Sequence, residues 1–433
     1  MKGLAVMVCL FGCVASGIAQ EQSLTGNWMA TVDFYGSPLY WKMELKQDGE
    51  RITGDFSGDK VEGTYAGGKL QFLAKDTHGG SEELTASVVN GQISGTVIWI
   101  DSSDKEHPAT RTFLAERVPV RPEGPAKTHE FVPTVFHRQF SALNKPVLTI
   151  NPGDTIHTTT VDAGGADATG VRRSLGGNPE TGPFYISSAM PGDTLVIHIK
   201  SLKLNRDYAI STDGIVPRAQ SQGMAVTMKD TGKGTKWKLD LTKGIATPEN
   251  PGEHMKNYTV PVRPMLGCIA VAVRPSNAAP GTGDDGSYGG NMDFNEITEG
   301  ATVYLPVMVP GALLYFGDGH AVQGDGETTG DALETSMDVT VTVDVIPGKR
   351  PMEPRIENAT HIMAMGENGS LDDAIKEATE NMASWLKDEY HLTPSEIGMV
   401  FGTAAEYRIS EVADRNAGVV LKISKERLKG LSK

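Results

Sequence analysis

One stretch organises this chain: Gly317-Asp318-Gly319-His320-Ala321-Val322-Gln323-Gly324-Asp325-Gly326-Glu327. Its carboxylate, imidazole and amide side chains are separated by glycine and other small residues, which leave room for a ligand. The apolar segment 312–316 precedes it, so the run is predicted to lie at the end of a β-strand. A histidine with several carboxylates at a strand end is what metal-assisted hydrolysis needs. A Gly/Asp-rich surface turn is the ordinary alternative, and the rest of the chain must decide between the two.

The composition predicts a mainly β protein with more than one domain. The chain has 433 residues, including 50 glycines and 24 prolines, and many segments are rich in Val, Thr and Ile. The formal net charge of −14 argues against nucleic acid or an anionic membrane as a partner. The sequence leaves the oligomeric state open, with a homo-oligomer among the alternatives.

Residues 1–19 are predicted to form a signal peptide. Lys2 precedes an apolar run over residues 4–14, and Gly17-Ile18-Ala19 fits a cleavage site. The apolar run is too short to span a bilayer. We therefore expect export to the periplasm or the extracellular space, with no transmembrane segment in the mature chain. A lipid anchor at Cys13 is the less favoured alternative, because Leu10-Phe11-Gly12-Cys13 fits a lipoprotein signal poorly.

Cysteine usage argues against a disulfide framework. Once the predicted signal peptide is removed with Cys9 and Cys13, only Cys268 is left, so no intramolecular disulfide can form. Cys268 lies in the apolar run 267–273, which reads as a strand. It is therefore interpreted as a small buried residue and not as a nucleophile.

Residues 23–118 are predicted to form a small up-and-down β-barrel or sandwich of about eight strands, with an accessory role in binding or docking. The unit opens with Gly26-Asn27-Trp28, which weakly resembles lipocalin-like barrels. Short alternating segments follow, separated by turn signals such as Asp48-Gly49 and Asn90-Gly91. A proline-rich linker over residues 119–133 separates this unit from a larger one, residues 134–433.

The larger unit is predicted to be built from β-hairpin modules with helices near the C-terminus. Pro-Gly turns begin predicted strands at Pro152-Gly153, Pro191-Gly192 and Pro310-Gly311. Strict alternation makes Met337–Ile346 the clearest strand. Helix starts are expected at Ser370 and at Thr393-Pro394-Ser395-Glu396, and the helices should cover the β core.

Several polar motifs occur in a fixed order along this unit. They are Thr158-x-x-x-Asp162, Thr181-Gly182-Pro183, Pro191-Gly192-Asp193, Gly289-Gly290-Asn291-Met292-Asp293, Leu305-Pro306-Val307-x-x-Pro310-Gly311-Ala312, and the run from Gly317 to Glu327. This order resembles the acetamidase/formamidase family from about residue 136 to residue 425. The resemblance implies a mainly β core of two packed barrel- or sandwich-like modules with peripheral helices. It also implies hydrolysis of small linear amides, such as formamide or acetamide, to ammonia and a carboxylate.

The chain departs from the family pattern at two places. Tyr288 stands where the family usually has histidine, and the loop after Asp162 reads Gly164-Gly165-Ala166-Asp167 where the family usually has a Gly-Gln-Ile type sequence. If either position contacts substrate or metal, the specificity or the activity of this chain differs from that of its relatives.

Amide hydrolysis needs a polarised carbonyl and an activated water, which a divalent metal supplies; zinc is our expectation. We hypothesise that Asp162, Asp318 and His320 are metal ligands. Glu327 would act as general base and acid, with Asp325 supporting it. The remaining candidates, Gln323, Asn291 and Asp293, would orient the amide.

Two alternatives to this hypothesis are a different nucleophile and a non-catalytic protein. A Gly-x-Ser-x-Gly elbow is absent, and Cys268 lies in a predicted strand, which disfavours serine or cysteine chemistry. A secreted β protein that binds a ligand or metal without catalysis stays open, since the extra N-terminal unit and Tyr288 both allow it.

Overall fold

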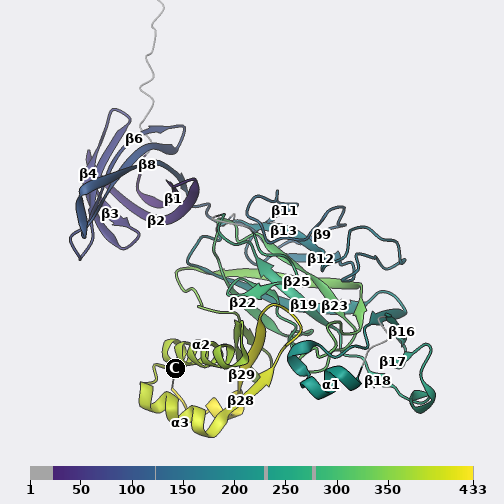
Figure 1. Ribbon diagram of the computed structural model, residues 1–433. Coiled ribbons are helices and arrows are strands. Elements are labelled where there is room, and N and C mark those ends of the chain that lie inside the picture. Colours follow the sequence, from purple (N-terminus) through teal and green to yellow (C-terminus); the bar gives the residue numbers. More distant parts are fainter. Residues whose placement is uncertain (1–22, 122, 229–232, 276–278, 433) are drawn as a thin grey trace, which may run out of the picture. The chain divides into compact units, whose positions relative to one another are not determined.

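The computed structural model describes residues 23–121, 123–228, 233–275 and 279–432 (Figure 1). The predicted signal peptide, residues 1–19, lies outside the described residues. The described residues form two compact units: residues 23–33 with Trp41–Arg117, and Phe34–Tyr40 with the described residues from Val118 onward. Strands dominate both, so the prediction of a mainly β fold with a separate N-terminal β-barrel is confirmed.

The smaller unit is a closed barrel of eight strands. Strand β1 (Gly26–Phe34) pairs with β8 (Asp104–Arg117) and closes the ring. Inward-facing side chains alternate along the strands and fill the interior, so this is a packed core. The strands between β1 and β8 follow in chain order: β2 (Ser37–Asp48), β3 (Arg51–Phe56), β4 (Asp59–Ala66), β5 (Lys69–Lys75), β6 (Ser81–Val89) and β7 (Gln92–Asp101).

Glu82 on β6 places a carboxylate in this interior. Its residue is only 8% exposed, and its Oε2 makes no hydrogen bond. Burial, and then the charges of Asp59 and Asp76, raise the pKa of Glu82 from 4.5 to about 7. The folded barrel therefore holds a proton that the unfolded chain releases.

We expect Glu82→Gln to stabilise the barrel at pH 8. Because the pKa of Glu82 is higher in the folded state, stability falls as the pH rises from about 4.5 to about 7, and the loss persists above that range. A neutral amide removes this loss, which we expect to be about 2 kcal/mol at pH 8 and to shrink towards pH 4. Calorimetry of the whole chain at both pH values measures it, with the exposed neighbour Glu83→Gln as the control. An effect of equal size at both pH values would contradict the assignment.

Two sheets build the larger unit. The first has nine strands in the order β28-β29-β27-β26-β22-β14-β25-β12-β9. Strand β25 spans Met337–Ile346, as predicted, and its Val339, Val341 and Val343 are fully buried. The other strands are β9 (Thr128–Glu130), β12 (Thr155–Thr159), β14 (Thr194–Leu204), β22 (Thr302–Pro306), β26 (Arg355–Glu357), β27 (His361–Asn368), β28 (Ala405–Ile409) and β29 (Ala417–Ser424).

The second sheet has twelve strands, of which nine follow the order β18-β17-β16-β15-β24-β23-β19-β21-β20. Strand β13 (Glu180–Ile186) joins β10 (Phe136–His137) and β11 (Leu148–Ile150) to β23. The strands on the main path are β15 (Tyr208–Ser211), β16 (Thr235–Asp240), β17 (Ile245–Pro248), β18 (Val260–Pro261), β19 (Met265–Val271), β20 (Asp285–Gly286), β21 (Gly289–Asn291), β23 (Leu314–His320) and β24 (Glu334–Thr335).

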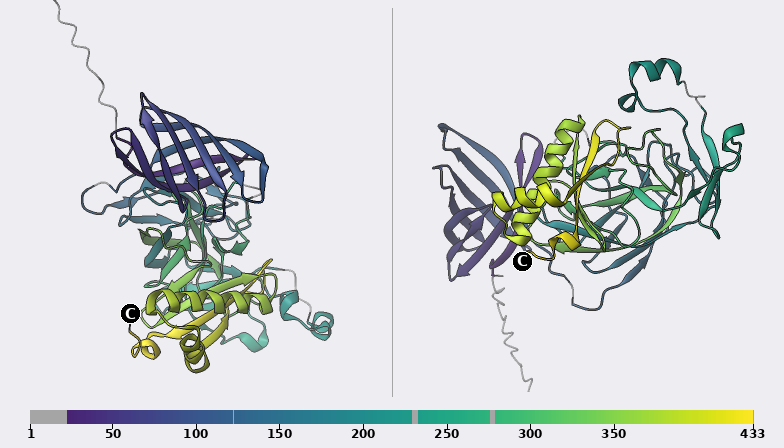
Figure 2. Two further views of the ribbon diagram at one scale, coloured as in Figure 1. Left: turned by 90° about the vertical axis from the view of Figure 1, so that its left-hand side faces the viewer. Right: turned by 90° about the horizontal axis from the view of Figure 1, so that it is seen from below.

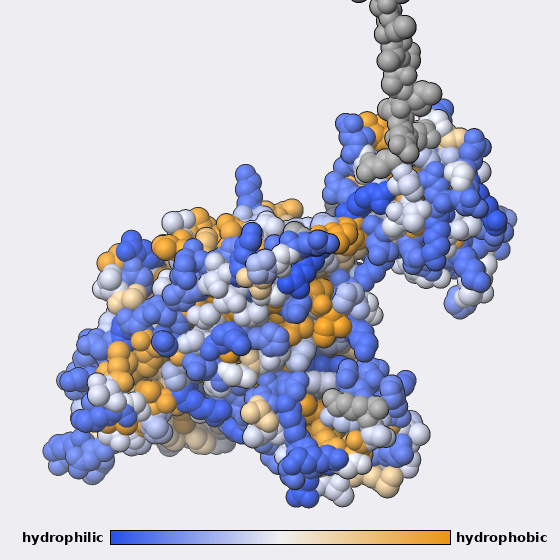
Figure 3. Space-filling view, turned by 180° about the vertical axis from the view of Figure 1, so that it is seen from behind, coloured by the Kyte–Doolittle hydropathy of each residue, from blue (hydrophilic) through white to orange (hydrophobic). Residues whose placement is uncertain are grey.

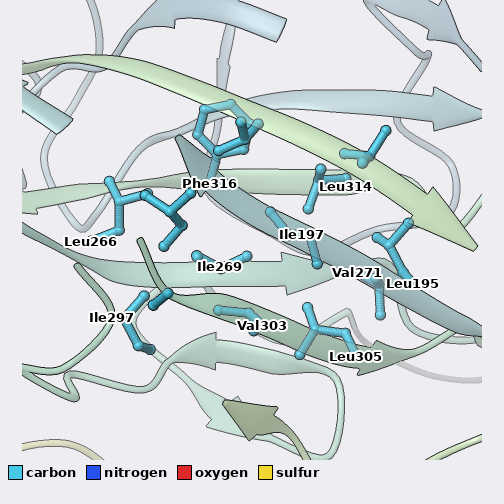
Figure 4. Close-up of a cluster of buried hydrophobic side chains, with 14 of the residues drawn as sticks. Leu195, Ile197, Leu266, Ile269, Val271, Ile297, Val303, Leu305, Leu314 and Phe316 are labelled. Carbon is cyan, nitrogen blue, oxygen red and sulfur yellow. The ribbon is translucent and has the colours of Figure 1, made fainter. Parts of the chain in front are cut away.

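The main hydrophobic core joins these two sheets. Figure 4 shows Leu195 and Ile197 of β14 and Val303 of β22 beside Ile269 of β19 and Phe316 of β23. All five residues are fully buried. This packing holds β19 and β23 rigidly, so polar side chains at the ends of these strands have fixed positions.

Helices cover one part of the nine-stranded sheet. Helix α2 (Leu371–Tyr390) begins after Ser370, whose side chain accepts from the Asp373 N–H, and packs on β27 and β29 (Figures 1 and 2). Helix α3 (Pro394–Ala404) begins with the predicted capping box of Thr393 and Glu396. The short helices are α1 (Gln222–Thr227) and α4 (Lys425–Leu428).

The surface of the larger unit is mixed. On the face shown in Figure 3, hydrophobic residues form scattered patches among hydrophilic ones. Among the described residues, no helix has the length and apolar character needed to cross a membrane. Strands β16 to β18 and α1 extend from the body of this unit in the views of Figures 1 and 2.

Candidate active site

The stretch that opened the sequence analysis lies on β23 and just beyond it. The strand was expected to end before Gly317, but in the structure it continues to His320. It continues because Gly317 and Gly319 pair with Cys268 and Leu266 of β19, where a larger side chain would meet buried neighbours. The polar run therefore begins inside the sheet, and His320 is fixed as a strand residue.

His320 lies among four acidic side chains. Its Nε2 lies 3.1 Å from Glu334 Oε1, 3.2 Å from Asp318 Oδ2 and 4.0 Å from Glu327 Oε1. Its Nδ1 lies 3.7 Å from Asp293 Oδ1. All of these residues are buried, with exposed fractions of 0–6%. We call these five residues the His320 cluster.

Gln323 fixes which nitrogen of His320 carries a proton. The Gln323 Nε2 donates to the backbone carbonyls of Asp293 and Ser410, which can only accept. Its Oε1 must therefore be the atom that lies 2.9 Å from His320 Nδ1, and Nδ1 donates to it. This leaves Nε2, the nitrogen that faces three carboxylates, as the one available to a ligand.

Three acids of the cluster have left-handed backbone conformations. Asp293, Asp318 and Glu327 have φ values of 41°, 50° and 40°. Non-glycine residues rarely adopt such angles, and each costs of order 1 kcal/mol that the surrounding fold must offset. Strained residues of this kind concentrate at functional sites, so the backbone angles of these three acids support a functional role for the His320 cluster.

The cluster has the properties of a cation site. Asp293 Oδ1, Asp318 Oδ1 and Glu334 Oε2 are buried without a hydrogen-bond partner. Ligand atoms of Asp293, Asp318 and His320, and likewise of His320, Glu327 and Glu334, lie within 4.8 Å of one another. Gly267 leaves the space open, because a Cβ there would lie 2.4 Å from Asp318 Oδ2 and 2.6 Å from Asp293 Oδ1. Carboxylates with one imidazole suit a divalent metal ion.

The electrostatics show how strongly these groups interact. Burial lowers the pKa of His320, but Glu334 and Asp318 outweigh it and raise that pKa well above its usual value. Burial raises the pKa of Glu334 to about 8, even though His320 opposes the shift. Burial, partly offset by His320, also raises the pKa of Glu327 well above its usual value. So many buried acids need a positive charge beside them, which either an imidazolium or a metal ion provides.

Asn291 and Asp293, two of the predicted substrate-binding residues, meet in the structure. The Asn291 Nδ2 donates to Asp293 Oδ2 and to Asp414 Oδ2, at 2.7 Å each. The Asn291 Oδ1 accepts from Asn178 Nδ2 at 2.9 Å. The amide of Asn291 is thus engaged by protein groups and holds the Asp293 carboxylate in place.

The structure does not bring Asp162 or Asp325 into the cluster. Asp162, predicted as a metal ligand, pairs with the buried Arg206 at 2.7 Å and accepts from the Ala166 N–H, so its charge is already compensated. Asp325, predicted to be catalytic, is bound by Arg408 and by Asn295, and Arg408 lowers its pKa despite partial burial. Both carboxylates are thus engaged by other groups of the protein.

Two acids near the site were not predicted from the sequence. Glu334 lies opposite His320 because β24 pairs with β23 there; its only sequence signal was an acid three residues before the clear strand β25. Glu180, on β13, is fully buried with neither carboxylate oxygen hydrogen-bonded. Burial and the charge of Asp318 raise the pKa of Glu180, so it lies beside the cluster as a neutral acid.

Tyr288, the residue that departs from the family pattern, is a packing residue here. Its ring lies 5.5 Å from that of Phe140, and it contacts two of the hydrophobic clusters. Burial raises its pKa, so the phenol stays protonated.

Comparisons with known proteins point to one family. Residues 274–424 match the model of the Acetamidase/Formamidase family. An acetamidase of Mycolicibacterium smegmatis is 43% identical over 61 residues, which are 14% of this chain and 15% of that protein. The matching segments thus span only 15% to 18% of the length of the curated relatives.

Solved structures match over much more of their length. A crystal structure of an acetamidase from Yersinia enterocolitica is 27% identical with a TM-score of 0.61, and the match covers 72% of this chain and 96% of that one. An acetamidase from Bacillus halodurans is 26% identical with a TM-score of 0.59, covering 70% of this chain and 100% of that one. The resemblance found from the order of the motifs is therefore confirmed. The part of the chain that the family model matches, residues 274–424, is thus similar to the Acetamidase/Formamidase family.

Proposed function

We propose that this protein hydrolyses small linear amides to ammonia and a carboxylate. The observation that carries the proposal is the His320 cluster, in which strained, buried carboxylates with unpartnered oxygens surround one histidine. The cluster lies on strands that include part of the family match, and the family and its named relatives indicate an amidase.

The proposal includes a divalent cation, for which zinc is our first choice. His320 Nε2, Asp318 Oδ2 and Glu334 Oε1 would hold it, because the two carboxylate oxygens lie 3.2 Å and 3.1 Å from that nitrogen. When bound, such an ion polarises the amide carbonyl and lowers the pKa of a water molecule. Asp162, which the sequence analysis placed among the ligands, has no part in this set.

The residues of the chain then supply orientation and proton transfer. Gln323 holds the His320 ring through Nδ1, and Asn291 holds Asp293. Glu327 is our choice for the group that removes a proton from the attacking water and delivers it to the departing ammonia. Its Oε1 accepts from the Ala332 N–H at 3.0 Å, and burial raises its pKa, so it can carry a proton near neutral pH.

Ammonia release from formamide, acetamide and propionamide tests the proposal. We expect turnover that falls by at least about a hundredfold after dialysis against a chelator and returns when a divalent metal is added back. Elemental analysis of the untreated protein identifies the metal. Full activity in the chelated, metal-free protein would contradict the metal part of the proposal. If no amide releases ammonia, a non-catalytic binding protein is favoured instead.

Export is a second, independent part of the proposal. It rests on the signal-like composition of residues 1–19. Fractionation of cells that express the whole chain tests it, together with N-terminal sequencing of the mature protein. A product that keeps Met1 and stays in the cytoplasm would contradict it.

A further inference from the structure

A small pocket lies beside a loop that also contacts the His320 cluster. Its volume is about 290 Å³, which suits a substrate of a few heavy atoms. Three short segments of the larger unit line it: Thr212-Asp213-Gly214, Lys233-Gly234 and Thr329-Gly330-Asp331. The last of these begins two residues after the proposed proton-transfer residue Glu327.

Hydrogen bonds connect this pocket wall to the cluster. The Ala332 N–H, next to Asp331, donates to Glu327 Oε1 at 3.0 Å and to Glu334 Oε1 at 2.9 Å. The Gly330 N–H donates to the Glu327 carbonyl. The loop that forms one wall of the pocket therefore also holds two carboxylates of the cluster. On the opposite wall, Thr212 Oγ1 donates to the Thr329 carbonyl at 2.6 Å, which ties the two walls together.

The pocket is acidic. Asp213 and Asp331 line it, and Lys233 is the one cationic side chain among its described lining residues. Burial raises the pKa of Asp331 although a side-chain hydrogen bond with Thr212 opposes the shift, and the charge of Asp318 adds to it, so Asp331 lies within electrostatic reach of the cluster. Asp414 adds a further carboxylate close enough to Asp318 and Asp331 to interact with their charges. Its pKa is raised to about 6 by burial and, among other charges, by Asp318 and Asp331.

We propose that this pocket selects amides by charge, favouring those that carry a protonated amino group and disfavouring those that carry a carboxylate. The inference rests on the proposed amide hydrolysis and names its substrate class. Carboxylates and a threonine hydroxyl oxygen are hydrogen-bond acceptors that an ammonium group satisfies. A carboxylate on the substrate would instead face like charges across a small, partly desolvated space.

Three amides of similar length test the inference on the intact protein: 4-aminobutanamide, pentanamide and succinamate. We expect kcat/KM to fall from the cationic to the neutral to the anionic amide, by about tenfold at each step, and the ratios to shrink as salt is added. Asp331→Asn should reduce the cation-to-anion ratio by about tenfold relative to wild type. The comparison of ratios cancels intrinsic differences in reactivity between the three amides.

Two further variants keep the test decisive. Asp213→Asn repeats it from the other wall, should Asp331→Asn fail to fold. Asp344→Asn, at an exposed position on β25, is the matched control and should leave the ratio unchanged. If the amides are hydrolysed without this order of preference, or if neither pocket variant changes the ratio, the charge selection is wrong while the amidase proposal stands. If none of the amides releases ammonia, the amidase proposal fails and this inference fails with it.

Discussion

His320→Ala is expected to lower amide hydrolysis by about a thousandfold or more and to remove the bound divalent metal. The imidazole Nε2 is the one nitrogen that faces the carboxylates of Asp318, Glu334 and Glu327. Without it, three acids remain close together with no cation that belongs to the protein. Their mutual repulsion then favours protonation, and protonated carboxyl groups bind metal ions poorly. Ammonia release and elemental analysis of the purified variant measure the two losses.

A control separates this effect from general damage. His254→Ala removes an exposed histidine from the same unit and should leave activity and metal content unchanged. Because His320 is buried, its removal also destabilises the fold, by a few kcal/mol. Circular dichroism and a thermal unfolding curve must therefore accompany the assay. A folded His320→Ala protein that keeps wild-type turnover would overturn both the metal assignment and the place of the active site.

The sequence predicted those parts of the fold that depend on local patterns. The barrel strands and β25 alternate with a period of two, and the resulting side-chain positions leave little choice of which face is buried. The starts of α2 and α3 carry capping residues whose hydrogen bonds are local. Cys268, in an unbroken apolar run, is fully buried as expected. Each of these features is decided within about ten residues of chain.

The site could be predicted only in part, because its geometry depends on long-range pairing. The run after Phe316 does carry Asp318, His320 and Glu327, and the family's motif order pointed to Asp293. Glu334 joins them only because β24 pairs with β23, which no local pattern reveals. Asp162 had the local features of a ligand, an acid beside glycines at a strand end. It is instead paired with Arg206, which the path of the chain brings to it from 44 positions later.

Gly267→Ala is expected to abolish metal binding with little change in the fold, and it tests the geometry of the cluster most directly. Gly267 lies on β19, in the middle of a rigid sheet, and adopts an ordinary strand conformation, so an alanine backbone fits there. The added methyl group would lie 2.4 Å from Asp318 Oδ2, 2.6 Å from Asp293 Oδ1 and 3.0 Å from His320 Cε1. Real Cβ atoms do not approach their neighbours so closely, hence both carboxylates must move.

That movement is restricted. The Asp293 carboxylate is held by Asn291, and both aspartates have strained backbone angles that leave few alternative positions. A displacement of about 1 Å in a ligand set of this kind is expected to cost at least about a hundredfold in turnover. Gly324→Ala is the matched control, because Gly324 lies in the run from Gly317 to Glu327 that carries the cluster, and a Cβ there meets nothing within 4 Å. If the cluster is the active site, Gly267→Ala loses metal and activity while Gly324→Ala keeps both; equal activity in the two variants would place the reaction elsewhere.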